Sequence, residues 1–149
     1  MRSPKPSPSR QAPAARRVLI VENCPLLRRG LTALIDNEHD LTVCAEAAAT
    51  LRETLDAIAS ARPDLVIVDL SIMMGDVLAM VKDIRLRHER LPVLLLGLDD
   101  APLYAARAFE AGASGCVSKQ GMTETLLIAI RCVLGGKRYV SPKMGTGTP

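Results

Sequence analysis

Three charged residues stand where short apolar runs end, and their types suit phosphoryl chemistry. They are Glu22, Asp69 and Lys119. A carboxylate such as Asp69 can act as a nucleophile toward a phosphoryl group. A second acid, Glu22, would repel it unless a cation lay between them, and Mg²⁺ prefers such oxygen ligands. Lys119 would bind phosphoryl oxygens as a point charge. Together the three residues form the minimum set for Mg²⁺-assisted phosphoryl transfer.

Taken singly, each of these residues would be an ordinary solvated loop residue. Whether they form one functional site depends on the elements that precede them. The apolar runs lack alternation, which is typical of strands buried on both faces of a parallel sheet. The sequence predicts strands at Val18–Val21, Leu41–Ala45, Leu65–Val68, Val93–Leu96 and Gly115–Val117.

Helical spacing fills the gaps between the strands. Helices are predicted from Pro25 onward and over about 50–61, 76–88, 101–111 and 122–134, and Thr123 is a candidate cap for the last one. Alternating strands and helices predict an α/β fold: one doubly wound, five-stranded parallel sheet with helices on both faces. Functional sites of such sheets lie beyond the carboxyl ends of the strands. Residues at those ends, including Asp69, Gly97 and Lys119, are therefore the site candidates.

Composition predicts one compact domain with short flanking segments. Of the 149 residues, 48% are hydrophobic and 23% are charged, which fits a globular protein. Residues 1–17 hold five basic residues and no acid, whereas the remainder holds 14 basic and 16 acidic residues. The positive net charge therefore belongs to the start of the chain and indicates nucleic-acid binding only weakly. We expect a disordered basic Pro/Ser-rich leader over 1–16, the folded domain over 17–136, and a linker-like tail over 137–149.

Localisation follows from the cysteines and the hydropathy pattern. Cys24, Cys44, Cys116 and Cys132 have no metal-binding or redox spacing and are interpreted as small hydrophobic residues in a reducing cytosol. No apolar run is long enough to span a membrane. The sequence thus predicts a cytoplasmic protein without a membrane partner.

Four segments carry a family resemblance. Residues 17–31, 63–71 and 111–119 resemble the opening, the phosphorylation-site strand and the final strand with its lysine in response-regulator receiver domains. Residues 135–142 resemble the exit of the NarL/FixJ type, where a linker leads to a helix-turn-helix domain. The resemblance covers residues 17–142. It implies the CheY-like, flavodoxin-like fold with strand order 2-1-3-4-5.

The resemblance also assigns roles to residues. Asp69 would be the phospho-acceptor and Lys119 would bind the phosphoryl group. The metal ligands for Mg²⁺ would be Glu22, Asp69 and the main-chain carbonyl of Ser71, with a weak contribution from Asn23. Expected partners are a sensor histidine kinase and a second copy of the chain in a homodimer. DNA binding would occur only through an output domain that this chain does not contain.

Several positions depart from the family pattern. Asn23 stands where a second acid is usual, so we expect Mg²⁺ to bind weakly. Gly97 replaces the hydroxyl residue that ends the fourth strand, and Cys116 replaces the aromatic switch of the fifth. The loop 72–76 lacks its usual proline. The acceptor is thus kept while both switch side chains are substituted.

Three functions compete. The first is a receiver of two-component signalling that accepts a phosphoryl group on Asp69 from a histidine kinase and regulates transcription through a separate or absent output. Such a receiver would not be an enzyme beyond Mg²⁺-dependent self-phosphorylation. The second is a pseudo-receiver that serves as an interaction or dimerisation module without phosphate. An enzyme on the same fold is disfavoured, because an aspartyl phosphatase would want an acid where Ser71 stands, and a flavodoxin-like carrier would want a phosphate loop after the first strand.

Overall fold

The computed structural model describes residues 13–47, 50–71, 76–97 and 102–142. Most of the predicted leader and the end of the predicted tail lie outside these residues. The strands are β1 (Arg16–Val21), β2 (Leu41–Ala47), β3 (Leu65–Asp69), β4 (Val93–Gly97), β5 (Gly115–Ser118) and β6 (Tyr139–Val140). The helices are α1 (Pro25–Asp36), α2 (Leu51–Ala61), α3 (Val77–Arg87), α4 (Pro102–Ala111) and α5 (Met122–Leu134).

All strand pairs are parallel, and the sheet order is β2-β1-β3-β4-β5-β6. The predicted order 2-1-3-4-5 is confirmed for the first five strands. The predicted number of strands is corrected, because β6 adds a short sixth strand beside β5. Its residues Tyr139 and Val140 lie in the segment that the sequence assigned to the tail. Two residues are too few for a periodic pattern, so the sequence alone does not show this strand.

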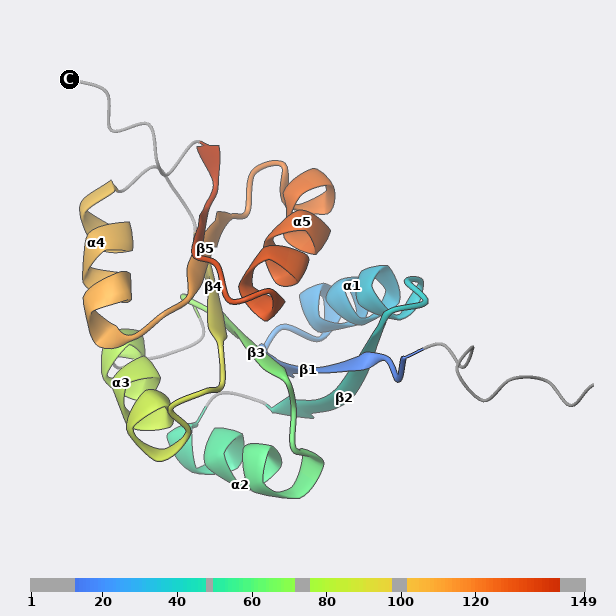
Figure 1. The fold of residues 1–149 in the computed structure, drawn as a ribbon, viewed down its shortest axis with the longest axis horizontal. Coiled ribbons are helices and arrows are strands. Elements are labelled where there is room, and N and C mark those ends of the chain that lie inside the picture. The colour runs from blue at the N-terminus through green and yellow to red at the C-terminus, as the bar shows by residue number, and fades with distance from the viewer. Residues whose placement is uncertain (1–12, 48–49, 72–75, 98–101, 143–149) are drawn as a thin grey trace, which may run out of the picture.

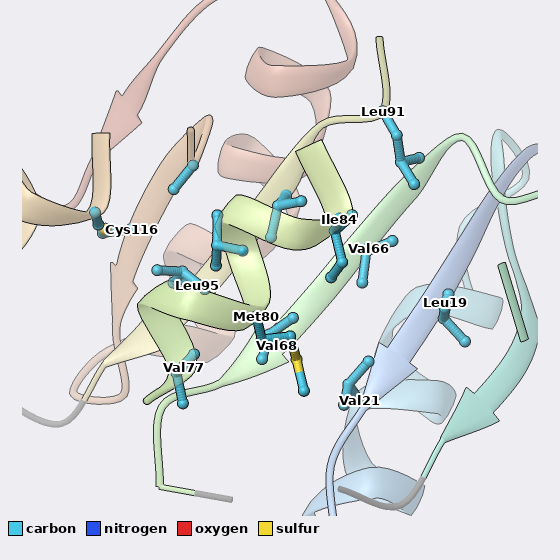
Figure 2. Packing of buried hydrophobic residues seen from close by; sticks show 14 of the residues in the cluster. Leu19, Val21, Val66, Val68, Val77, Met80, Ile84, Leu91, Leu95 and Cys116 are labelled. Carbon is cyan, nitrogen blue, oxygen red and sulfur yellow. The ribbon is translucent and has the colours of Figure 1, made fainter. Parts of the chain in front are cut away.

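Helices cover both faces of the sheet, as Figure 1 shows, with α1 and α5 on one face and α2, α3 and α4 on the other. Successive strand residues alternate between these layers. On β3, Val66 and Val68 belong to the cluster under α3, and Leu65 and Ile67 belong to the cluster under α1 and α5. Figure 2 shows the first cluster, with Val77, Met80 and Ile84 of α3 over the sheet. The core strands are therefore buried on both sides, which explains their continuous apolar sequences.

The helix ends follow local chemistry. Thr50 caps α2 by accepting a hydrogen bond from the Glu53 N–H, and Asp76 caps α3 by accepting one from the Leu78 N–H. Gly112 follows α4 with a φ of 110°, a conformation that favours glycine. The predicted cap of α5 is wrong, because the N-cap is Gly121 with a φ of 70° instead of Thr123. Within the described residues, no helix combines the length and the apolar character needed to cross a membrane.

Candidate functional site

The parallel register brings the three predicted charged residues to one edge of the sheet. Val21 pairs with Val68, so Glu22 follows β1 at the level where Asp69 ends β3. Gly97 at the end of β4 pairs with Ser118, which places Lys119 just beyond the end of β5. The Lys119 Nζ lies 2.7 Å from Asp69 Oδ2. Residues separated by up to 97 positions in sequence thus form one cluster at the carboxyl edge, as expected for this fold.

The Asp69 carboxylate is buried and held from two sides. Its Oδ1 accepts hydrogen bonds from the Ser71 N–H at 2.8 Å and from the Ser71 hydroxyl at 2.9 Å. Its Oδ2 forms the ion pair with Lys119, whose Nζ also donates to Ser71 Oγ at 3.2 Å. Sequence reasoning gave Ser71 only a main-chain role and missed its side chain. The Asp-x-Ser spacing was the available signal, since an aspartate often accepts bonds from the residue two positions on.

Glu22 is also buried, with an exposed fraction of 1%. Its Oε1 accepts a hydrogen bond from the Cys24 N–H at 3.0 Å, and Arg28 donates to its main-chain carbonyl at 3.1 Å. Burial above all, together with the neighbouring Asp69 carboxyl group, raises the pKa of Glu22 to about 7. A shift of this kind shows that a second negative charge is costly at the site.

Asp69 behaves in the opposite way. Burial alone would raise its pKa, but the interactions with Glu22, Lys119 and Ser71 lower the pKa of Asp69 below its usual range. Asp69 is therefore the carboxylate that keeps its charge, and Glu22 is the one that takes up a proton more readily. An ionised carboxylate is the form in which Asp69 could act as a nucleophile.

The donor set fits a hard cation. Among the described residues, Glu22 Oε2 and Asp69 Oδ2 are buried side-chain oxygens with no hydrogen-bond partner, although Asp69 Oδ2 has its ion pair with Lys119. Buried carboxylate oxygens without hydrogen-bond donors are typical of a site that binds a cation through oxygen ligands. The raised pKa of Glu22 fits such a site, because a cation would favour its ionised form. The part of the chain that the structure describes holds no group of three or more His, Cys, Asp and Glu side chains suited to a metal. Among the described residues, the site thus offers a cation two acidic side chains, Glu22 and Asp69, and not three.

The three substituted positions lie in strands of the same sheet or directly after them. Asn23 is exposed and directly follows Glu22. Gly97 accepts the Lys119 N–H through its carbonyl at 2.8 Å, so it contacts the lysine with its main chain and brings no hydroxyl. Cys116 is fully buried and belongs to the same cluster as Val77 and Met80 of α3 (Figure 2), and burial raises the pKa of its thiol to about 12. A thiol held neutral in this way behaves as a small apolar side chain.

A hollow of about 1010 Å³ lies elsewhere, at the amino ends of the strands, and contains none of the predicted site residues. Its lining includes Arg85, Arg87, Lys137 and Arg138. Carboxyl ends of helices converge there, and basic side chains offset the partial negative charge of those ends. This hollow therefore does not replace the cluster around Asp69 as the candidate site.

Comparison with known proteins agrees with this geometry. The chain resembles the transcriptional regulatory protein YvfU of Bacillus subtilis, with 33% identity over 128 residues that cover 86% of this chain and 64% of that protein. It resembles the oxygen regulatory protein NreC of Staphylococcus epidermidis with 28% identity, covering 87% of this chain and 60% of that protein. The chain thus spans somewhat less than two thirds of the length of these curated relatives.

Solved structures show the same fold. A two-component response regulator of the LuxR family from Aurantimonas sp. SI85-9A1 superposes with a TM-score of 0.82 and 30% identity, covering 88% of this chain and 93% of that one. The receiver domain of RcsB from Salmonella enterica gives 0.78 at 20% identity, covering 87% and 96%. The family described as response regulator receiver domain matches residues 18–131. The chain therefore belongs to the response regulator receiver domains of two-component systems.

Proposed function

We propose that Asp69 is the phospho-acceptor of this receiver and that a sensor histidine kinase supplies the phosphoryl group. The observation that carries this proposal is the buried Asp69 carboxylate, 2.7 Å from the Lys119 ammonium. Because the relatives include a transcriptional regulatory protein, the output would be transcription, through a DNA-binding domain. The receiver unit would cover residues 17–136, between a basic leader and a linker-like tail.

The two Asp69 oxygens have different roles in this mechanism. Oδ1 is held by two hydrogen bonds from Ser71, whereas Oδ2 forms the ion pair with Lys119. Oδ2 would attack the phosphorus of the donor. A new P–O bond forms to Asp69 as the bond to the donor's leaving group breaks, and the leaving group departs with the electron pair. Lys119 would transfer its contact from Oδ2 to a phosphoryl oxygen and offset the charge there.

Mg²⁺ is the cofactor that we propose for this reaction. Glu22 and Asp69 would hold it, with the Ser71 main-chain carbonyl and, weakly, Asn23. When bound, the ion neutralises charge on the phosphoryl oxygens. Glu22 must give up its proton to bind a cation, and its raised pKa makes that step unfavourable in the absence of the cation. The chain's own contribution is to keep both carboxylates buried and fixed through Cys24 and Ser71.

The test is covalent labelling with a small phosphodonor. The 149-residue chain is incubated with acetyl phosphate and Mg²⁺, and its intact mass is measured. One phosphate adduct is expected in the wild type, none in Asp69→Asn, and none when EDTA replaces Mg²⁺. Asp76→Asn is the matched control, since Asp76 is an exposed helix cap in the same part of the fold. An adduct that persists in Asp69→Asn would overturn the assignment.

The alternative function, an interaction module that works without phosphate, gains support only from Gly97 and Cys116. Gly97 lacks the hydroxyl that the family resemblance places against the phosphoryl group, but neither substitution removes the attacking Asp69 carboxylate or the Lys119 ammonium. The geometry of Glu22, Asp69 and Lys119 supports the phosphorylated receiver, and the labelling experiment separates the two functions.

A further inference from the structure

The short strand β6 runs along β5 toward the Asp69 site. Two ladder hydrogen bonds join them: the Tyr139 N–H donates to the Ser114 carbonyl at 3.2 Å, and the Ser141 N–H donates to the Cys116 carbonyl at 3.0 Å. A third bond continues in the same direction, because the Ser118 N–H donates to Ser141 Oγ at 2.9 Å. Ladder bonds of parallel strands are evenly spaced, so the hydroxyl takes the place of the next main-chain acceptor.

The sequence allows this close approach of the tail to β5. A Cβ at Gly115 would lie 2.9 Å from the Tyr139 carbonyl oxygen, so a side chain at that position would push β6 away. Gly136, with a φ of 84°, turns the chain after α5. Arg138 then lies over the Phe109 ring, 5.0 Å from its centroid, and ties the tail to α4. Docking of β6 therefore depends on several specific residues.

The last of these bonds holds the segment that carries the site lysine. Ser118 and Ser141 are both buried, with exposed fractions of 2% and 3%. The next residue, Lys119, donates its N–H to the Gly97 carbonyl at 2.8 Å on the other side. The end of β5 is thus fixed by β4 at Lys119 and by Ser141 at Ser118. Without the Ser141 hydroxyl, a buried N–H directly before the lysine would lose its acceptor, which is unfavourable.

We infer that Ser141 is a positioning residue for phosphoryl transfer to Asp69. It acts through the Ser118 main chain and sets the point from which the Lys119 side chain reaches Asp69 Oδ2 and Ser71 Oγ. The inference rests on the proposed function of Asp69. The segment predicted as a linker-like tail would then contribute to the site, because the Ser141 hydroxyl lies beyond residue 136. Coupling of this kind is reciprocal: a Lys119 that moves toward a phosphoryl oxygen acts back on the bond to Ser141.

The experiment compares Ser141→Val with Ser141→Thr in the full chain. The two side chains have the same shape, and only threonine keeps the hydroxyl. The rate of Asp69 labelling by acetyl phosphate with saturating Mg²⁺ is followed by intact mass as a function of donor concentration. We expect the maximal rate to fall about threefold to tenfold in Ser141→Val, the range of a typical hydrogen bond. Ser141→Thr should stay within about twofold of the wild type.

A second readout needs no phosphate. Amide hydrogen exchange at Ser118 and Lys119 should be faster in Ser141→Val than in Ser141→Thr, while exchange in α1 stays unchanged. Equal labelling rates, or equal exchange at Ser118, in the Val and Thr variants would overturn the positioning role. Failure of the wild type to be labelled at all is a different result, because it would overturn the proposed function itself and the inference with it.

Discussion

The ammonium group of Lys119 lies 2.7 Å from Asp69 Oδ2, the carboxylate oxygen that we assign as the nucleophile. Lys119 is 22% exposed at its side chain, whereas the Asp69 side chain is 1% exposed. The lysine thus reaches from the surface onto a buried charge. In the absence of a phosphoryl group, its positive charge offsets the negative charge of two buried acids, and the following predictions depend on that balance.

Removal of Lys119 should destabilise the fold through the carboxylate that it leaves behind. In Lys119→Met the free energy of unfolding should fall by roughly 1–3 kcal/mol, the range for a buried polar group left without its partner. The double variant Lys119→Met/Asp69→Asn should recover most of that loss, because the buried charge is then gone. Urea denaturation of the wild type, both single variants and the double variant measures this. Additive losses in the double variant would show that the ion pair contributes nothing.

Glu22 should make stability depend on pH in metal-free buffer. Its pKa in the folded protein is about 7, above the ordinary 4.5, so the folded state binds this proton more firmly than the unfolded state does. The resulting stability is fully present below the unfolded pKa and is lost as the pH rises through about 7. Glu22→Gln keeps an oxygen for the Cys24 N–H but cannot ionise.

At pH 8, Glu22→Gln should therefore be more stable than the wild type by roughly 1–3 kcal/mol. The gain should shrink as the pH falls and vanish below the ordinary pKa of 4.5. Urea denaturation in EDTA at several pH values provides the measurement. Glu89→Gln, at an exposed position, is the control for the substitution itself. A gain that is the same at pH 5 and pH 8 would mean that Glu22 does not titrate in this window.

The sequence predicted the meeting of Glu22, Asp69 and Lys119, because continuous apolar runs and the rule for parallel sheets depend only on local pattern and topology. The strand order was implied by the family resemblance and not by these patterns. The sequence missed contacts that depend on side-chain geometry. The Ser71 hydroxyl on Asp69 Oδ1 and the Ser141 hydroxyl on the Ser118 N–H each join residues whose spacing carries no periodic signal. The α5 cap was wrong because Gly121 adopts a left-handed conformation, which a search for capping side chains does not consider.

Asn23 should limit the affinity for Mg²⁺. It follows Glu22 at the carboxyl edge and is exposed, so an aspartate there would add one partly screened charge. Asn23→Asp should bind Mg²⁺ more tightly by about 1 kcal/mol, which corresponds to roughly fivefold in the dissociation constant. Titration calorimetry on both proteins measures the change, with Asn37→Asp, at the far end of α1, as the control. No difference between wild type and Asn23→Asp would mean that position 23 does not face the ion.

The last prediction concerns the response to phosphorylation at the α4–β5 face. A ligand shifts a two-state equilibrium only through contacts that differ between the two states. In this family such contacts are expected from a hydroxyl at the end of the fourth strand and an aromatic in the fifth. Gly97 offers its main-chain carbonyl to Lys119, and Cys116 is a fully buried small side chain. We therefore expect phosphorylation to change the surroundings of Tyr104, Phe109 and Cys116 little.

Beryllofluoride, a phosphoryl mimic, tests this prediction through amide NMR shifts and sedimentation. Shifts should be large next to Asp69 and Lys119 and small over 102–116, and any dimer should form with similar affinity with and without the mimic. Gly97→Ser restores a hydroxyl at the end of β4 and should increase the shifts over 102–116. Large shifts across that face in the wild type, or a dimer that depends on the mimic, would show that the chain switches conventionally. Shifts that extend along β6 instead would indicate that the signal leaves the site through Ser141, the bond that joins the end of β5 to the tail.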